Sequence, residues 1–159
     1  MKNIKIRKVK KTDKRYFTQW WRDRDLAKLT SGVLRSITND QLDKYFNNIL
    51  DSAKDYHFVI TLSNKVIGHI SLSKKRIWYE TQIIIGDKKY WGKGHGTEAI
   101  KLLIKYAHKL KISKIFLEVR PDNIRAIKSY EKCGFKRKRI IKYSENKHLP
   151  ETLRMELKK

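Results

Sequence analysis

The chain has 159 residues, 40% of them hydrophobic, which fits one domain with a filled core and argues against intrinsic disorder. Its 39 Lys and Arg outnumber its 16 Asp and Glu, giving a net charge of +23, and the single cysteine, Cys133, excludes an internal disulfide framework and suggests a reducing compartment. No apolar run is long enough for a signal peptide or a membrane span, so we expect one cytoplasmic domain over residues 1–159.

Hydrophobic periodicity and turn residues divide the chain into alternating strands and helices. In chain order we predict a strand at 4–9, a helix at 12–21, a helix from Thr38, strands at 57–62, 65–72 and 77–85, a helix from the glycine-rich loop to about 110, a strand at 115–119, a helix at 123–134, and strands at 135–141 and 152–157. The order β-α-α-β-β-β-α-β-α-β-β predicts an α/β sheet with helices on its faces.

Two local patterns anchor this assignment. Thr38 and Gln41 form a capping box. The threonine oxygen accepts a hydrogen bond from the third helical amide, and the glutamine side chain accepts one from the Thr38 amide. The run Ile83 to Ile85 is apolar on both faces, which is typical of a central strand.

A glycine-rich loop, Trp91-Gly92-Lys93-Gly94-His95-Gly96-Thr97, lies between that central strand and the next helix. Glycines allow the backbone to approach a phosphate, and the unpaired amides of a first helical turn point toward an anion. A Walker loop requires Lys followed by Ser or Thr, and a Rossmann fingerprint requires a third glycine where Thr97 stands, so both are excluded. A turn without a ligand remains the alternative for the loop by itself.

A second block, Asn123 to Phe135, reads N-x-x-A-x-x-x-Y-E-K-x-G-F just after a buried strand. Together with the string Tyr90 to Ala99, it resembles the GNAT superfamily of N-acetyltransferases. Trp91 departs from the Gln or Arg that usually opens the family's loop. Tryptophan at this place is similar to the branch of ribosomal-protein N-terminal, aminoglycoside 6′- and amino-sugar acetyltransferases.

The resemblance implies a mostly antiparallel sheet of about seven strands whose central strands splay apart, with acetyl-CoA as co-substrate and no metal. The pyrophosphate would bind the loop amides, and pantetheine would lie along the main chain beside the splay, with an asparagine at its base. The implied acetyl-CoA residues are Ile84, Ile85, Gly86, Trp91, Gly92, Lys93, Gly94, His95, Gly96, Thr97, Asn123, Ala126 and Tyr130.

Acyl transfer to an amine requires a neutral nucleophile, stabilisation of an oxyanion and a proton for the leaving thiolate. Tyr130 matches the family's tyrosine near the CoA sulfur and is the candidate acid; a core tyrosine is the alternative. Glu80, an acid in an apolar strand, is the candidate base, and burial would raise its pKa into a useful range. A strand-end glutamate paired with a lysine is the alternative for Glu80. Amides near Ile85 would serve the oxyanion.

The acceptor is the least defined part. Trp20, Trp21 and Asp23 form a W-x-x-D pattern similar to that branch and are candidates to line an acceptor pocket, although such aromatics are more often a helix's buried stripe. A ribosomal-protein N-terminus, an aminoglycoside, a nucleotide-linked amino sugar and a polyamine remain open. The net charge disfavours a polycationic acceptor, since like charges repel and no acidic cluster is evident.

The same charge supports a second hypothesis, a basic ribosome- or RNA-associated binding module with little catalysis. Against it, the sequence has no RNA-binding motif. Among partners we therefore expect acetyl-CoA, an amine and a possible ribosomal or other anionic partner, no membrane, and a monomer or homodimer.

Overall fold

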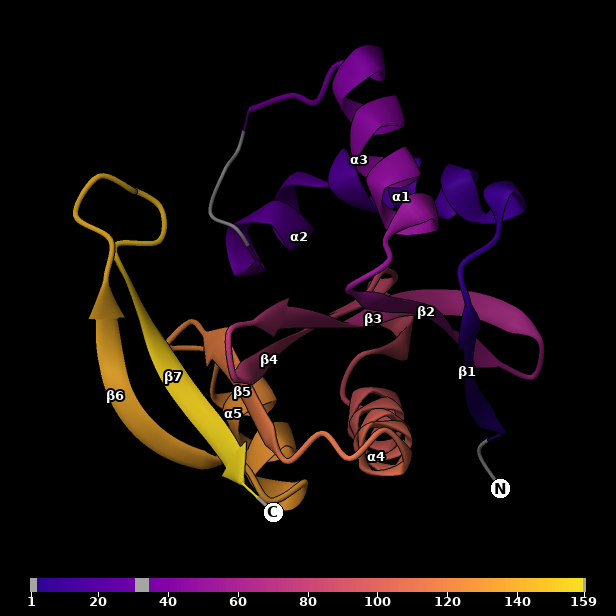
Figure 1. Ribbon diagram of the computed structural model, residues 1–159. Helices are drawn as coiled ribbons and strands as arrows, with labels where there is room; N and C mark the ends of the chain where they lie inside the picture. The colour runs from indigo at the N-terminus through magenta and orange to yellow at the C-terminus, as the bar shows by residue number, and fades with distance from the viewer. Residues whose placement is uncertain (1–2, 31–34, 159) are drawn as a thin grey trace.

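A seven-stranded sheet with the order β1-β2-β3-β4-β5-β7-β6 runs through the computed structural model, which describes residues 3–30 and 35–158 (Figure 1). Only the β4–β5 pair is parallel; the other neighbours are antiparallel. The strands are β1 Ile4–Lys8, β2 Tyr56–Leu62, β3 Lys65–Lys75, β4 Trp78–Ile85, β5 Lys114–Val119, β6 Lys136–Lys142 and β7 Glu151–Lys158. The predicted fold class, with its mixed sheet of seven strands, is confirmed.

The helices form two layers, one on each side of the sheet (Figure 1). They are α1 Lys14–Trp21, α2 Arg24–Leu29, α3 Asn39–Asp51, α4 His95–Lys109 and α5 Ile124–Lys132, with short 3₁₀ turns at Lys11–Asp13 and Lys88–Tyr90. The layer of α1, α2 and α3 packs a cluster centred on Phe17 against β2. The layer of α4 and α5 covers the larger core, to which every strand except β6 contributes.

The predicted element order lacked α2, because residues after Trp21 were interpreted as a polar stretch. Asp23 starts this helix: its carboxylate accepts hydrogen bonds from the amides of Asp25 at 2.9 Å and Leu26 at 3.2 Å. The helix has six residues, of which Leu26 alone is fully buried. So short a segment with one buried side chain carries no helical periodicity that a sequence pattern would reveal.

The central strands β4 and β5 diverge. They pair only at Tyr79 with Ile115 and at Glu80 with Phe116. Beyond Glu80, β4 continues to pair with β3 and β5 continues to pair with β7, so the edges that face each other are left without a partner strand. This confirms the predicted splay, and the gap opens the sheet between its two helical layers.

Two histidines stack in the layer beneath α1. The His57 and His69 rings lie 5.3 Å apart at an angle of 10°, with His57 Nδ1 3.2 Å from His69 Nε2. The Phe17 ring packs edge-on against His69 at 4.9 Å. Desolvation, followed by the charge of His57, lowers the pKa of His69 to about 3, and desolvation also lowers the pKa of His57. Both rings are therefore neutral in the folded protein near pH 7.

This pair predicts a loss of stability in mild acid. Because the pKa of His69 in the folded protein lies below its unfolded value near 6.5, the unfolded chain takes up a proton first as the pH falls. The stabilisation is complete above about pH 6.5 and is lost toward lower pH, by up to about 1.4 kcal/mol per pH unit for each such histidine. Urea unfolding at pH 7.5 and pH 5 measures the change in the free energy of unfolding. In the variant His69→Gln, the free energy of unfolding should depend less on pH. The exposed His108→Gln should follow the wild type; an equally steep His69→Gln curve would refute the interpretation.

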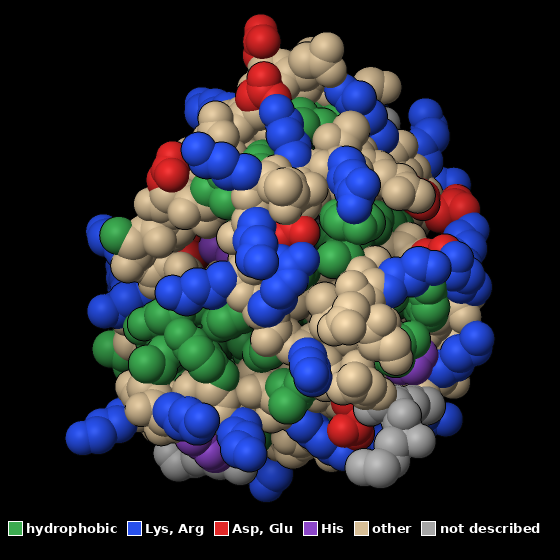
Figure 2. All heavy atoms as spheres, turned by 90° about the vertical axis from the view of Figure 1, so that its right-hand side faces the viewer, with side chains coloured by type: hydrophobic (Ala, Val, Ile, Leu, Met, Phe, Trp, Pro, Cys, Tyr) green, Lys and Arg blue, Asp and Glu red, His purple; other side chains and the backbone are tan. Residues whose placement is uncertain are grey.

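The basic side chains are distributed over the surface. Figure 2 shows Lys and Arg across the whole face that it presents, with hydrophobic and uncharged areas between them. The edge strand β6 follows the same pattern, since Lys136, Arg137, Lys138, Arg139 and Lys142 are all exposed. Charges on an edge strand discourage pairing with another chain, so part of the charge has a structural explanation. Within residues 3–30 and 35–158, no helix is both long and apolar enough to cross a bilayer.

Candidate functional site

A cavity of about 470 Å³ occupies the gap between β4 and β5. Its walls come from both sides of the sheet: Ile83, Ile100 and Tyr130 belong to the side of α4 and α5, and Leu26 and Thr30 come from α2 and its C-terminal end. The predicted acetyl-CoA residues and Glu80 all line it except Gly86 and Lys93. Residues predicted from separate motifs therefore converge on one space.

The glycine-rich loop brings the first turn of α4 to this cavity. Gly94 is the N-cap of α4 and has φ = 80°, a left-handed conformation that glycine adopts without strain. The first intrahelical bond is donated by the amide of Glu98 to the Gly94 carbonyl at 3.1 Å. The amides of residues 95–97 precede that bond and lie at the positive end of the helix dipole. This geometry suits an anion such as a pyrophosphate.

Trp91 joins the loop to the end of β4. Its indole Nε1 donates a hydrogen bond to the Ile85 carbonyl at 2.7 Å, and the guanidinium of Arg125 lies 4.4 Å from the centre of its ring. Trp91 therefore fixes the loop through the indole ring, which explains how the loop keeps its position without the usual Gln or Arg. No sequence pattern pointed to Arg125 as its partner.

The strand alternation decides which groups of β4 face the gap. Tyr79 faces β5, so Thr81, Ile83 and Ile85 direct their main-chain groups to the same side. The prediction for Gly86 needs correction: its amide donates to the Ile67 carbonyl at 2.9 Å, on the β3 side. Glycine is required there by packing, because a Cβ atom would lie 1.8 Å from Trp20 Nε1. Lys93 is exposed and does not line the cavity.

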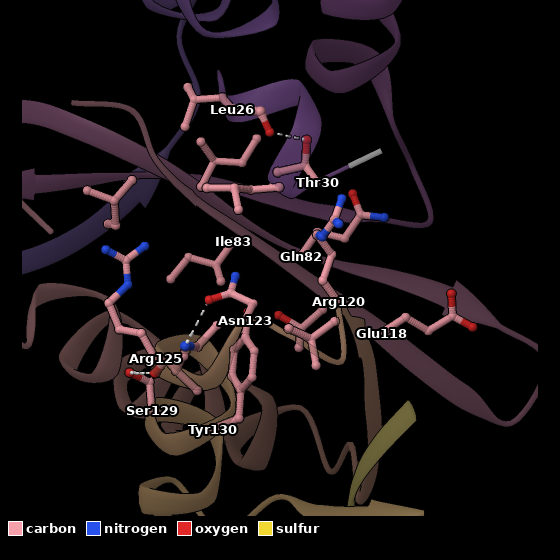
Figure 3. Close-up of a pocket in the computed structure, with 18 of the residues that line it drawn as sticks. Leu26, Thr30, Gln82, Ile83, Glu118, Arg120, Asn123, Arg125, Ser129 and Tyr130 are labelled. Atoms are coloured by element: carbon pink, nitrogen blue, oxygen red, sulfur yellow. Dashed lines mark hydrogen bonds between the residues drawn. The ribbon is translucent and has the colours of Figure 1, made fainter. Parts of the chain in front are cut away.

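Helix α5 places Asn123 and Tyr130 in the cavity wall. Asn123 caps the helix by accepting the Ala126 amide at 3.3 Å, and Tyr130 follows two turns later (Figure 3). Tyr130 is 9% exposed, and burial raises the pKa of its phenol to about 12. Its hydroxyl therefore holds its proton at neutral pH, as a candidate acid must.

Glu80 lies at the last β4–β5 pair, where the gap begins. Its side chain is 19% exposed, and the cation paired with it is Lys75, with Nζ 3.9 Å from Oε2. Gln82 Nε2 lies 3.5 Å from Oε1. These contacts are loose, and the carboxylate faces the cavity with room for a ligand.

Glu118 and Tyr143 are cavity residues that sequence reasoning missed. Glu118 of β5 accepts a hydrogen bond from the Tyr143 hydroxyl at 2.6 Å, and both side chains line the cavity. The signal for Glu118 was available: it is an acid in an otherwise apolar strand, the argument applied to Glu80. Tyr143 follows β6, in a segment with no recognisable motif.

Arg120, which lines the cavity, links two segments that are distant in the sequence. Its guanidinium donates to the Lys28 carbonyl at the end of α2 at 2.8 Å and to the His148 carbonyl at 3.0 Å. It also pairs with Asp122 at 3.1 Å. The positive charge of Arg120 is therefore engaged by both Asp122 carboxylate oxygens and two carbonyls, and two distant segments are joined beside the gap.

The structure places the predicted acceptor residues away from the cavity wall. Trp20 is 6% exposed in the cluster around Phe17, Trp21 packs against the same cluster, and Asp23 caps α2. These positions correspond to the buried-stripe alternative. Cys133 is half-buried, and burial is the main factor that raises the pKa of its thiol, which makes it a weak nucleophile.

Three comparisons place this architecture among known proteins. A protein of Bacillus subtilis named "Probable N-acetyltransferase YjcK" is 35% identical over 99 residues, 58% of this chain and 55% of that protein. The structure of spermidine N-acetyltransferase from Vibrio cholerae in complex with CoA and spermine superposes with a TM-score of 0.85 at 23% identity, covering 98% of this chain and 95% of that one. The aminoglycoside acetyltransferase AAC(6')-Ib in complex with coenzyme A gives 0.80 at 18% identity, covering 99% and 95%.

The solved structures share the fold of this chain. The chain spans between 39% and 66% of the length of the curated relatives that it matches. The sequence model of the acetyltransferase (GNAT) domain matches residues 3–136, which include the splayed strands, the glycine-rich loop and α5. On that match, the chain belongs to the GNAT family of acetyltransferase domains.

Proposed function

We propose that this protein transfers an acetyl group from acetyl-CoA directly to a primary amine. The observation that carries the proposal is the convergence, in one cavity at the splay, of the loop amides before α4, the buried Tyr130 hydroxyl and the Glu80 carboxylate. The first supports a pyrophosphate, the second a leaving thiolate, and the third an incoming ammonium group. Ile84 and Ile85 complete the acyl-donor wall, with the gap-facing amide of Ile85 suited to the oxyanion.

The residues fit a direct transfer in a ternary complex. Glu80 accepts a proton from the ammonium group, the free amine nitrogen bonds to the thioester carbonyl carbon, and the carbon–sulfur bond breaks. Tyr130 gives its proton to the departing thiolate, and the second proton that the nitrogen loses as it becomes an amide restores the phenol through solvent. Glu80 then releases its own proton to solvent. Because the pKa of Cys133 is raised, a covalent acetyl-cysteine step has no support from this site.

The acceptor is proposed as a small-molecule amine. Similar proteins are named for amines of this kind: "Aminoglycoside N(6')-acetyltransferase type 1" of Klebsiella pneumoniae and "Probable spermine N(1)-acetyltransferase" of Bacillus subtilis subsp. natto. A ribosomal-protein N-terminus and a nucleotide-linked amino sugar were also expected from the sequence and belong in the same test.

A thiol-release assay with acetyl-CoA tests the proposal. Free CoA is measured for aminoglycosides, polyamines, amino sugars and ribosomal-protein N-terminal peptides, with mass spectrometry of the product. We expect one N-acetylated amine per thiol released. Absence of transfer to every class, together with RNA binding that weakens steeply with salt, would instead favour the basic binding module.

Replacing Glu80 by Gln is expected to lower kcat/KM at neutral pH by roughly 10²-fold or more, the range of general-base contributions. At lower pH the amine is an ammonium ion and needs the base most, so the deficit should grow as pH falls and shrink as pH rises. A pH profile of kcat/KM measures it, with the exposed Glu98→Gln as control. An unchanged profile would remove Glu80 as the base.

A further inference from the structure

The cavity carries a second carboxylate that the proposed transfer does not use. Glu118 lies two residues beyond Phe116, the partner of Glu80, so both acids point to the same face of the sheet. The alternation of strands places their Cα atoms roughly 8 Å apart, and the splay widens this separation. Figure 3 shows Glu118 directed away from Tyr130, so it lies on the outer side of the cavity.

Tyr143 is hydrogen-bonded to Glu118 and lies near enough to Glu80 for the charge of Glu80 to affect its pKa. Its hydroxyl donates to Glu118 at 2.6 Å, and burial together with the charges of Glu118 and Glu80 raises the pKa of Tyr143 to about 12. The hydroxyl therefore stays protonated and holds one Glu118 oxygen in place, while the other oxygen remains available to a ligand.

The chain has 39 lysines and arginines, yet those nearest to Glu118 bond to other groups. Within residues 3–30 and 35–158, no lysine or arginine forms an ion pair with it. Its cross-strand neighbour Arg154 instead bonds Glu156 at 2.8 Å and lies 3.8 Å over the Phe116 ring. Arg120 is held by Asp122 and two carbonyls.

Most acids elsewhere in sheet and helix surfaces have a close partner. Six such ion pairs measure between 2.8 and 3.2 Å: Arg7–Asp13, Lys89–Asp87, Lys101–Glu98, Arg120–Asp122, Arg137–Glu131 and Arg154–Glu156. A partly buried carboxylate with one hydrogen bond and no ion pair can form a charge-assisted hydrogen bond with a cation from outside. With 39 basic residues available, the missing partner at Glu118 points to a cationic ligand.

We propose that Glu118, positioned by Tyr143, binds a second ammonium group of the acceptor while the first reaches Glu80. This inference rests on the proposed function and narrows its acceptor to amines with a second cationic group a few bonds away. It differs from the expectation, drawn from the net charge, that a polycationic acceptor is disfavoured. The net charge is an average over the surface, whereas recognition depends on the carboxylates inside the cavity.

Matched acceptors test this directly. We expect kcat/KM for 1,4-diaminobutane or 1,5-diaminopentane to exceed that of butylamine or pentylamine by at least about tenfold, since a charge-assisted hydrogen bond contributes that much. Glu118→Gln keeps an oxygen for Tyr143 and should reduce the diamines to the level of the monoamines, mainly through KM. Turnover of the monoamines by the same variant is the reference against which the loss for the diamines is measured. Glu151→Gln removes an exposed charge outside the cavity and should preserve the preference.

The tests distinguish a failure of the second ammonium site from a failure of the proposed acetyl transfer. Equal kcat/KM for diamines and monoamines in the wild type, or a preference that survives Glu118→Gln, overturns the second ammonium site but leaves the proposed function standing. Calorimetric binding of 1,4-diaminobutane in the presence of CoA gives a readout independent of turnover. Glu118-dependent binding without transfer would support the site and contradict the proposed function, and binding unaffected by Glu118→Gln would overturn the site.

Discussion

Tyr130→Phe is expected to lower kcat by about 10² to 10³-fold, within the range of general-acid contributions. The phenol is buried in the wall of the gap, and its raised pKa keeps it protonated until a thiolate needs the proton. The substitution removes one oxygen and leaves the ring contact with Phe135 intact, so KM for acetyl-CoA should change little. Steady-state kinetics with varied acetyl-CoA separates the two constants.

The control for this variant is Tyr106→Phe, at another partly buried tyrosine of the same core that does not line the cavity. It should leave kcat unchanged. If Tyr130→Phe turned over as fast as Tyr106→Phe, Tyr130 would be a packing residue, as the core-tyrosine alternative holds, and the thiolate would take its proton from elsewhere.

The largest loss of stability is expected from Phe17→Ala, about 3–5 kcal/mol in the free energy of unfolding. Phe17 is 0% exposed and is the centre of its cluster, with its ring 5.3 Å from the rings of Trp20, Trp21 and Phe46 and 4.9 Å from His69. Alanine would leave a cavity that these rigid rings cannot fill. Urea denaturation with a fitted m-value measures the change.

Tyr45→Ala is the matched control, because Tyr45 belongs to the same helical layer but is 47% exposed. A loss for Phe17→Ala no larger than that for Tyr45→Ala would contradict the packing described. The layer also supports the site: Trp20 lies directly over Gly86 at the end of β4, and α2 forms part of the cavity wall. We therefore expect the Phe17 variant to weaken acetyl-CoA binding as well.

Local chemistry predicted most of the fold. The capping box of Thr38 and Gln41 is present, with the threonine oxygen 3.2 Å from the Gln41 amide. Gly134 has φ = 96° just past α5, the left-handed conformation expected at a helix end. Both depend on residues a few positions apart, which sequence patterns report well.

Long-range proximity accounts for what the sequence did not predict. Glu80 and Glu118 line one cavity only because β4 and β5 pair in one register, and a parallel register cannot be predicted from either strand alone. Tyr143 reaches Glu118 through a connection without periodicity. The family resemblance implied Gly86 as part of the pantetheine-binding main chain, yet the Trp20 ring above it explains the glycine.

Amide hydrogen exchange with and without CoA tests the central claim most directly, namely that the gap between β4 and β5 binds the acyl donor. We expect CoA to slow exchange at the gap-facing amides of Ile83 and Ile85 and at residues 95–97, where the amides precede the first bond of α4. The β1 edge should exchange as before. Unchanged exchange at the gap and the loop at saturating CoA, or slowing confined to other surfaces, would contradict the assignment of this site.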